Sequence, residues 1–503
     1  MTAPPLIPRC PEDVKAHVVL AFTNAFDLLL ADATSGALAT AREAERQVWA
    51  RFIPVLGLVL TAVFSAMCRR ATEQALAATG RTMADVWMRM DVAGFMGLVT
   101  TVGSIRFPLW SFRETRGGKS ESPARALFPM HPHSRSSMLC MEWEALLASD
   151  HPFRRAAVAL QFFTHGAVDL EDTTIASHAV RAGLHMSRDW LYKTPADIRE
   201  ILRERATRDN TTGRPLVYAS TDAHALSMYV DWTWDSAYKM WNGIRLWCID
   251  RKTGQIIHLG GDFAMDDCRG VAERFLALQT GGQMPANGDY GDGVAAQIVF
   301  PTDGARWIVD HVLPLFPGAI AVLDVYHVLE KVTLFAVGAF ARSKKQQKAL
   351  FRKALVALGL PPRRPRRKGL LRAGPATKSP EPKAPRDPDG SGERLLKVLQ
   401  EEPRPDDDSA IEKCDGVEAF VAKNIDRMHY GALHARGIQI GSGAMESIHR
   451  NGSQLRTKLC GCRWTLEAAQ AILNLRMLAL SGRWNEYWAQ SDLAGRMARR
   501  EVT

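Results

Sequence analysis

Residues 319–327, Ala-Ile-Ala-Val-Leu-Asp-Val-Tyr-His, decide the fold class of this chain. Five apolar residues in a row predict a strand that is buried on both faces, as in a parallel sheet. A long helical pattern begins at Val325, so Asp324 stands at a junction between a strand and a helix. In an open α/β sheet, chemistry gathers outside the carboxyl ends of such strands.

The sequence on the amino-terminal side of this strand predicts the rest of a sheet. Three runs joined closely predict an antiparallel meander, and a helix, a short strand and a second helix follow. These elements are expected near 215–221, 239–249, 255–259, 267–278, 297–300 and 304–313. Their order predicts an α/β core of the RNase H-like type, with a mixed sheet in which the meander is joined by parallel strands.

Helical sequence surrounds this core. We expect a mainly helical amino-terminal region with a short hairpin near 97–112, an all-helical insertion with a basic, proline-rich linker, closing core helices and a tail. The predicted segments are 1–165 (amino-terminal region), 166–212, 213–335 (core, first part), 336–434 (insertion, linker at 361–390), 435–485 (core, closing helices) and 486–503 (tail). The linker carries too little apolar sequence to order itself.

Residues 172–193 predict a helix, a turn at Gly183 and a second helix capped by Ser187. The second helix would carry Arg188 and Lys193, and the pattern resembles a helix-turn-helix whose second helix enters a DNA major groove. An ordinary helical hairpin is the alternative.

The charge and cysteine content restrict the class of protein. The 503 residues contain 64 Lys and Arg against 54 Asp and Glu, a net charge of +10 that favours a polyanionic partner. Eight scattered cysteines without a Cys-x-x-Cys pair exclude a disulfide scaffold or zinc ribbon and favour a cytoplasmic location. The uncharged run 52–68 contains Pro54, and we interpret it as a buried core helix rather than a membrane span.

Four acidic residues fall at predicted strand ends or at the start of a helix: Asp222, Asp303, Asp324 and Glu446. Each also fits an ordinary role as a turn residue, a helix cap or a complement to the helix dipole. As a set gathered at one sheet edge, they would repel one another unless a cation neutralised them. Hard oxygen ligands suit Mg²⁺ or Mn²⁺, and two such ions promote phosphodiester cleavage and joining.

The strings around these acids resemble a known family. They are Pro-Thr-Asp-Gly-Ala-Arg-Trp-Ile (301–308), Leu-Asp-Val-Tyr-His-Val-Leu-Glu (323–330), Ile-Gly-Ser-Gly-Ala-Met-Glu-Ser-Ile-His-Arg (440–450) and Cys-Arg-Trp-Thr (462–465) with Arg-Trp (483–484). Over about 170–490, the chain looks like DDE transposases of bacterial insertion sequences, the ISKra-like group, related to the hAT and Mutator-like enzymes.

The resemblance implies roles for particular residues. Asp222, Asp303 and Glu446 match the catalytic carboxylates that hold two Mg²⁺ or Mn²⁺ ions, and Asp324 with His327 matches the Asp-x-x-His motif. The gap of 21 residues between Asp303 and Asp324 favours Asp303 as the second carboxylate, although Asp324 also ends a strand. His327 could act near the site or brace the sheet.

The implied activity is cleavage of double-stranded DNA at the terminal inverted repeats of an element, followed by strand transfer into target DNA. A homo-oligomer in the synaptic complex and association with the bacterial nucleoid when bound follow from the same resemblance. The candidate DNA-binding residues are Arg188, Lys193, Arg450, Arg456, Lys458 and Arg463. A solvated basic helix is the alternative for the last four. An RNase H-like nuclease without strand transfer and a catalytically decayed DNA-binding regulator are the alternative functions.

Overall fold

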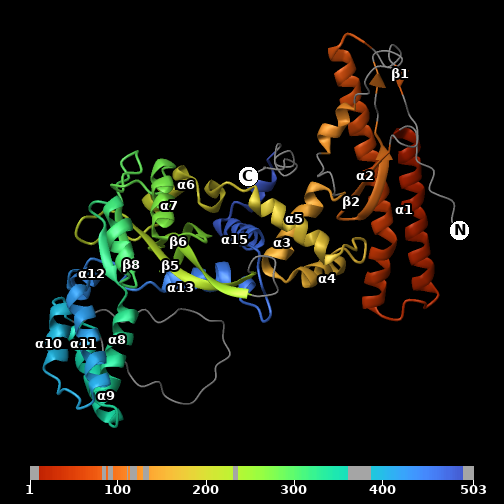
Figure 1. Ribbon diagram of the computed structural model, residues 1–503. Helices are drawn as coiled ribbons and strands as arrows, with labels where there is room; N and C mark the ends of the chain where they lie inside the picture. The colour runs from red at the N-terminus through yellow and green to blue at the C-terminus, as the bar shows by residue number, and fades with distance from the viewer. Residues whose placement is uncertain are drawn as a thin grey trace. The chain divides into compact units, whose positions relative to one another are not determined.

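The computed structural model describes residues 11–81, 87–88, 95–109, 112–113, 122–128, 135–229, 236–360 and 387–490 (Figure 1). The chain divides into two compact units. The first is Met1–Met186 with Trp484–Thr503, and the second is Ser187–Arg483. This division falls inside 166–212, which the sequence pattern predicts to be a single segment.

A five-stranded mixed sheet forms the centre of the second unit. Its order is β7-β6-β5-β8-β9; β5, β6 and β7 pair antiparallel, whereas β8 and β9 run parallel to β5. The strands are β5 (Leu216–Tyr229), β6 (Ser236–Ile249), β7 (Ile256–Ala264), β8 (Gln297–Thr302) and β9 (Ile320–Leu323). The predicted mixed α/β sheet, a meander joined by parallel strands, is therefore confirmed.

Strand β5 is longer than its sequence pattern suggests. The expected strand ends before Asp222, whereas β5 continues to Tyr229 because its antiparallel pairing with β6 extends that far. Its parallel pairing with β8 is short and ends at Tyr218 opposite Val299. Asp222 thus lies in the middle of a strand, at the level where β8 ends, and does not close the strand.

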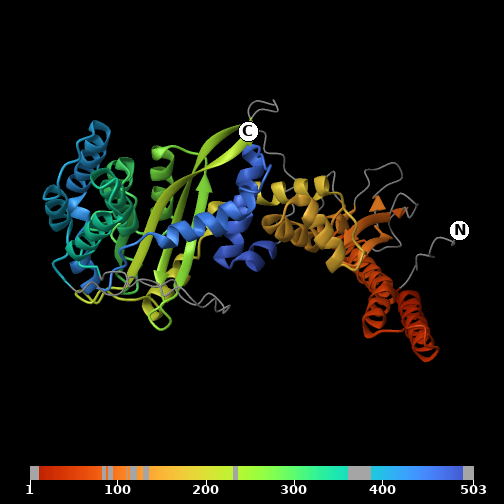
Figure 2. The same ribbon diagram turned by 90° about the horizontal axis from the view of Figure 1, so that it is seen from below.

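Helices cover both faces of the sheet (Figures 1 and 2). On one face, α13 (Gly443–Ile448) contacts β6 and α15 (Leu466–Ser481) contacts β7. On the other, α7 (Cys268–Thr280) packs Phe275 against Phe300 of β8. Between β8 and β9, the expected helix 304–313 is replaced by a π-helical turn, Ile308–Val312, and a 3-10 turn, Leu313–Leu315.

The insertion consists of helices in the part that the structure describes. They are α9 (Lys344–Ala357), α10 (Gly392–Gln400), α11 (Asp408–Lys423) and α12 (Tyr430–Ala435); α8 (Val325–Ala339) starts at β9 in the predicted core segment and ends just inside the insertion. Their apolar side chains form one continuous core with those of the sheet, from Leu216 and Val299 to Leu350 and Leu395. Residues 361–386 of the predicted linker lie outside the described residues.

The first unit is mainly helical, as expected. Its helices are α1 (Pro11–Thr34), α2 (Ala41–Ala78), α3 (Met138–Asp150), α4 (Phe153–Phe163), α5 (Asp172–Leu184) and α16 (Trp484–Trp488). The predicted hairpin is present as β2 (Phe95–Thr100) and β3 (Gly103–Pro108). A small core joins α2 to this hairpin through Cys68, Leu98 and Phe107.

The prediction of a buried helix for residues 52–68 is half right. The run is helical, within α2, but only 11% of its most apolar window is buried, and Leu56, Val59 and Val63 are exposed. By length and composition α2 and the segment Lys15–Thr34 of α1 could each cross a membrane, a criterion that core helices of soluble proteins and signal sequences also meet.

The predicted second helix of the helix-turn-helix is wrong. Ser187 does cap a helix, but this is a 3-10 helix of four residues, Arg188–Leu191, too short for a recognition helix. The chain turns extended immediately afterwards, because Tyr192 bridges to Gly260 and the amide of Lys193 donates to the carbonyl of Leu259 in β7. The next helix, α6, runs from Pro195 to Glu204.

Candidate active site

Three aspartates stand in one row across neighbouring strands. Tyr218 of β5 is opposite Val299 of β8, so four further residues on each strand bring Asp222 level with Asp303. The amide of Asp324 donates to the carbonyl of Thr302 at 2.7 Å, where β9 and β8 end. Parallel neighbours lie about 4.8 Å apart and point to the same face at the same level. Asp222 lies opposite Gly243, whose Cβ position faces Met445 of α13, and Asp324 binds Ser442 just before α13, so these two acids are on the face that α13 covers.

Asp222 is half-exposed, with 41% of its side chain accessible. Its Oδ1 accepts a hydrogen bond from the amide of Ala223 at 2.7 Å. Partial burial raises the pKa of Asp222 above its usual range, and the nearby carboxylates of Asp303 and Glu446 raise it further. Asp303 and Glu446, although distant in the sequence, are therefore close enough for their charges to act on Asp222.

Asp303 and Asp324 differ in what surrounds them. Asp303 is partly exposed, and one oxygen accepts from the amide of Ala305 at 2.9 Å. Asp324 is fully buried; Oδ1 accepts from the amide of Tyr326 at 2.7 Å, and Oδ2 accepts from both the amide and the hydroxyl of Ser442. Asp324 therefore has its oxygens engaged by the protein, which favours Asp303 as the second site carboxylate.

Glu446 lies exposed in the first turn of α13, and two buried contacts hold that helix to the sheet. Asp324 binds Ser442 immediately before the helix, and Arg245 of β6 donates to the main-chain oxygen of Ala444. Burial lowers the pKa of Arg245 to about 10, so it remains charged at neutral pH. The Gly-Ser-Gly-Ala-Met-Glu-Ser string thus fixes where Glu446 stands.

The donor set suits a hard divalent cation. It offers three carboxylates and, in Asp222 and Asp303, an oxygen beyond the one that caps the main chain. Within the described ranges, no three His, Cys, Asp or Glu side chains lie close enough together to hold a metal ion as they stand. Coordination of a shared ion therefore requires the exposed side chains to turn toward one another.

Histidines adjoin this site on two sides. His327 of α8 is 39% exposed in its side chain, its Nδ1 lies 3.7 Å from Glu330, and its charge lowers the pKa of Asp222. His327 is thus partly exposed and pairs with its own helix, and its role at the site stays a prediction. His449, one turn beyond Glu446, lies with its Nε2 3.8 Å from Oδ2 of Asp222. His449 lies within the quoted string 440–450, but the sequence assigns it no role.

Arg427 is a second residue near the site that no sequence pattern marks. It lies at the end of a 3-10 turn, Ile425–Arg427, and donates to the hydroxyl of Thr302 at 3.1 Å, one residue before Asp303. Burial lowers the pKa of Arg427, and the charge of Asp303 opposes that shift. A cation beside the acids could meet a phosphate that enters the site.

The predicted DNA-binding residues separate by exposure. Arg450, Lys458 and Arg463 are exposed, whereas Arg456 is 2% exposed and stacks over Trp464 at 4.7 Å. Its buried guanidinium gives Arg456 a packing role in place of the expected phosphate contact.

Arg188 and Lys193 do not lie on a recognition helix. Lys193 donates to the carbonyl of Ser481 at 3.1 Å, and Arg188 lies 3.9 Å from Asp262. Both side chains thus contact the protein beside α15 and β7.

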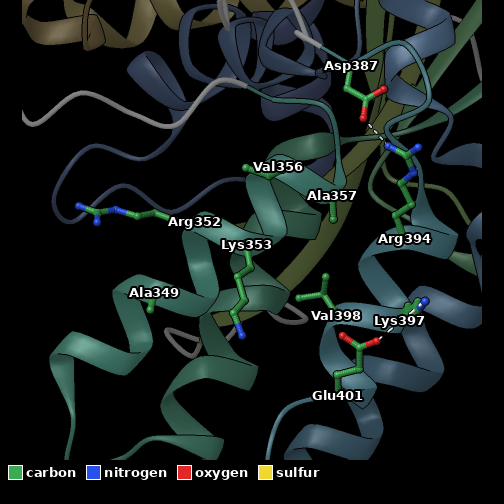
Figure 3. Close-up of a pocket in the computed structure, with 10 residues that line it drawn as sticks. All are labelled: Ala349, Arg352, Lys353, Val356, Ala357, Asp387, Arg394, Lys397, Val398 and Glu401. Carbon is green, nitrogen blue, oxygen red and sulfur yellow. Dashed lines mark hydrogen bonds and ion pairs between the residues drawn. The ribbon is translucent and has the colours of Figure 1, made fainter.

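The insertion contains a separate open cavity of about 590 Å³ between α9 and α10 (Figure 3). Four of its charged side chains form two pairs, Arg394 with Asp387 and Lys397 with Glu401, and Arg352 and Lys353 also line it. None of the site acids lines it.

No protein-family model matches the chain, and no curated protein matches it. The family resemblance therefore rests on the quoted strings and on the arrangement of the residues in them.

Proposed function

We propose that this protein is a DDE-type transposase with an RNase H-like core, which cleaves DNA at the ends of an element and transfers the freed strands into target DNA. The observation that carries the proposal is the row in which Asp222 and Asp303 stand level on neighbouring strands, with Glu446 near enough to act on the pKa of Asp222.

In this proposal Asp222, Asp303 and Glu446 hold two Mg²⁺ or Mn²⁺ ions. When bound, such ions lower the pKa of an attacking water or hydroxyl and stabilise the charge that develops on phosphate. Asp324 supports the site indirectly, because it binds Ser442 and so holds α13, which carries Glu446. Arg427 and the exposed cations Arg450, Lys458 and Arg463 are proposed to contact the DNA backbone.

The proposed partners are double-stranded DNA, as element ends and as target, and further copies of the chain in a synaptic complex. A cytoplasmic protein that associates with the nucleoid through DNA is the corresponding location. The positive net charge is consistent with such a partner.

The test uses the DNA that flanks the coding region. Inverted repeats there are expected, bounded by short direct repeats. Labelled duplexes that carry these ends should be nicked at the element boundary in Mg²⁺ and then joined to a plasmid target. Nicking without joining would favour the RNase H-like nuclease, whereas binding without nicking would favour the decayed regulator.

A further inference from the structure

Behind Asp222, a line of buried polar side chains lies inside the second unit. His449 Nε2 lies 3.8 Å from Oδ2 of Asp222, and its Nδ1 lies 2.8 Å from Nδ1 of His224. Nε2 of His224 lies 2.7 Å from the hydroxyl of Ser453. His224, His449 and Ser453 are 6%, 4% and 0% exposed, so their hydrogen-bond partners come mainly from the protein.

The ends of this line determine the direction of its hydrogen bonds. A carboxylate only accepts, so a proton on His449 Nε2 is the arrangement compatible with Asp222. A neutral His449 then accepts at Nδ1, so His224 must donate from its own Nδ1. His224 in turn accepts at Nε2, and the hydroxyl of Ser453 donates to it. Each donor in the line therefore points toward Asp222.

The contact between the two rings requires a neutral acceptor. One Nδ1 must accept from the other at 2.8 Å, so at least one of the two rings carries a single proton. A neutral histidine carries one proton on one of its two nitrogens, which is the condition for the ordered line. Within the described residues Nε2 of His449 has no hydrogen-bond partner; the acceptors beside it are the carboxylate of Asp222, at 3.8 Å, and the main chain of the same residue.

Packing fixes the two rings in place. The ring of Phe263 meets both His224 and His449 edge to face, with centroids 5.4 Å apart in each case. Gly243, opposite Asp222 in the sheet, leaves room for this arrangement, since a Cβ there would lie 2.5 Å from Phe263 and 2.9 Å from Met445. His449 follows Glu446 by three residues, so one helical segment serves two of the site carboxylates.

We propose that His449 is a positioning residue: its Nε2 lies 3.8 Å from Oδ2 of Asp222, a small shift of the partly exposed carboxylate closes this to a hydrogen bond, and that bond sets the carboxylate for a divalent cation, with the His449 tautomer fixed by His224 and Ser453. The inference rests on the proposed function, because it takes Asp222 as a metal ligand. A carboxylate has about four lone-pair sites, so the hydrogen bond leaves others for the ion. Partners of this kind orient metal ligands and raise metal affinity.

The first experiment measures Mn²⁺ affinity of the full chain by calorimetry without DNA. His449→Phe, which keeps an aromatic ring but removes the donor, should weaken binding by about 10- to 100-fold. His449→Gln, which returns an N–H at similar reach, should restore most of the affinity. His258→Gln is the matched control, because His258 is a neutral, largely buried histidine of the same sheet whose two nitrogens have no described partner. It should leave affinity unchanged.

The second experiment does not depend on a change in affinity. Nitrogen NMR of ¹⁵N-histidine-labelled protein should show His449 protonated at Nε2 and His224 protonated at Nδ1, with signals assigned through the single variants. A Ser453→Ala change should disturb the His224 signal first.

Two results would overturn the inference: the opposite tautomers, or full Mn²⁺ affinity in His449→Phe while Asp222→Asn loses it. If Asp222→Asn itself kept full Mn²⁺ affinity, the proposed function would fail, and the inference with it. The tautomers would then report separately on whether the hydrogen-bonded line exists.

Discussion

The ends of β8 and β9 look alike in sequence and differ in the structure. Each strand is apolar and is followed at once by an aspartate, Asp303 or Asp324, and each aspartate accepts a main-chain hydrogen bond two residues ahead. The remaining oxygen of Asp324 is taken by Ser442, more than a hundred residues further on, and the side chain is fully buried. Asp303 stays partly exposed beside Asp222.

The place of an acid at a strand end therefore does not decide its role. The role depends on which segment, further along the chain, packs over the end of the strand. Ser442 converts Asp324 into a structural link between the sheet and α13, whereas Asp303 keeps an oxygen available to the site. Substitutions can separate these two kinds of acid.

The largest effect is expected from the site acids. Asp222→Asn, Asp303→Asn and Glu446→Gln should each reduce DNA nicking on the order of a thousand-fold or more, because each removes a charged ligand from the ions that stabilise the phosphate. Binding of an end duplex in a gel-shift assay should stay nearly unchanged. Nicking that persists in Asp303→Asn would show that Asp303 is not the second carboxylate.

The next effect is on stability, and here the substitution of Asp324 is expected to matter more than that of Asp303. Asp324→Ala should lower the free energy of unfolding by about 2–4 kcal/mol, since it removes a helix cap and leaves the buried groups of Ser442 unpaired. Asp303→Ala, the matched control, should change it by less than about 1 kcal/mol. Urea unfolding measures both, and equal effects would contradict the distinction.

A third aspartate, Asp209, is expected to make the stability of the fold depend on pH. Its buried side chain binds Arg436, which with two local donors lowers the pKa of Asp209 to about 2 from its ordinary 3.8. Because the unfolded chain takes up this proton first, the stabilisation of roughly 2 kcal/mol is present above about pH 4 and disappears as the pH falls toward 2. Asp209→Asn should therefore be less stable than the parent at pH 6, and the difference should shrink on acidification in thermal melts.

The smallest effect is expected at single surface cations. Arg450→Ala or Lys458→Ala should weaken DNA binding and reduce the slope of log affinity against log salt by about 0.9 for each phosphate that is no longer neutralised. Arg456→Ala should instead lower stability, because its side chain packs over Trp464. An unchanged salt slope in the Arg450 and Lys458 variants would show that these two side chains do not contact the DNA.

Much of the fold was predictable, because alternating and apolar runs report directly on strands and on burial. The meander, the parallel strands and the helix after Asp324 follow from local pattern. The length of β5 was not predictable from local pattern, since it depends on the pairing of β5 with β6. The helix expected after Ser187 failed for a similar reason, because Tyr192 and Lys193 pair with β7 instead.

The site was predictable only in part. The acids stand out in sequence because each follows an expected strand or opens an expected helix, although Asp222 turns out to lie inside β5. The contacts of His449, Arg427 and Ser442 with that site join residues more than a hundred positions apart, which no local pattern encodes. The exposure of α2 could not be read from its apolar run either, since burial depends on what packs against the helix.

The most direct test of the proposed metal site is the location of Mn²⁺ by anomalous scattering in crystals of the full chain grown with that ion. We expect manganese coordinated by oxygens of Asp222, Asp303 and Glu446, with Asp324 still bound to Ser442. Manganese held by Asp324 in place of Asp303, or no manganese at Asp222 at saturating concentration, would contradict the proposal.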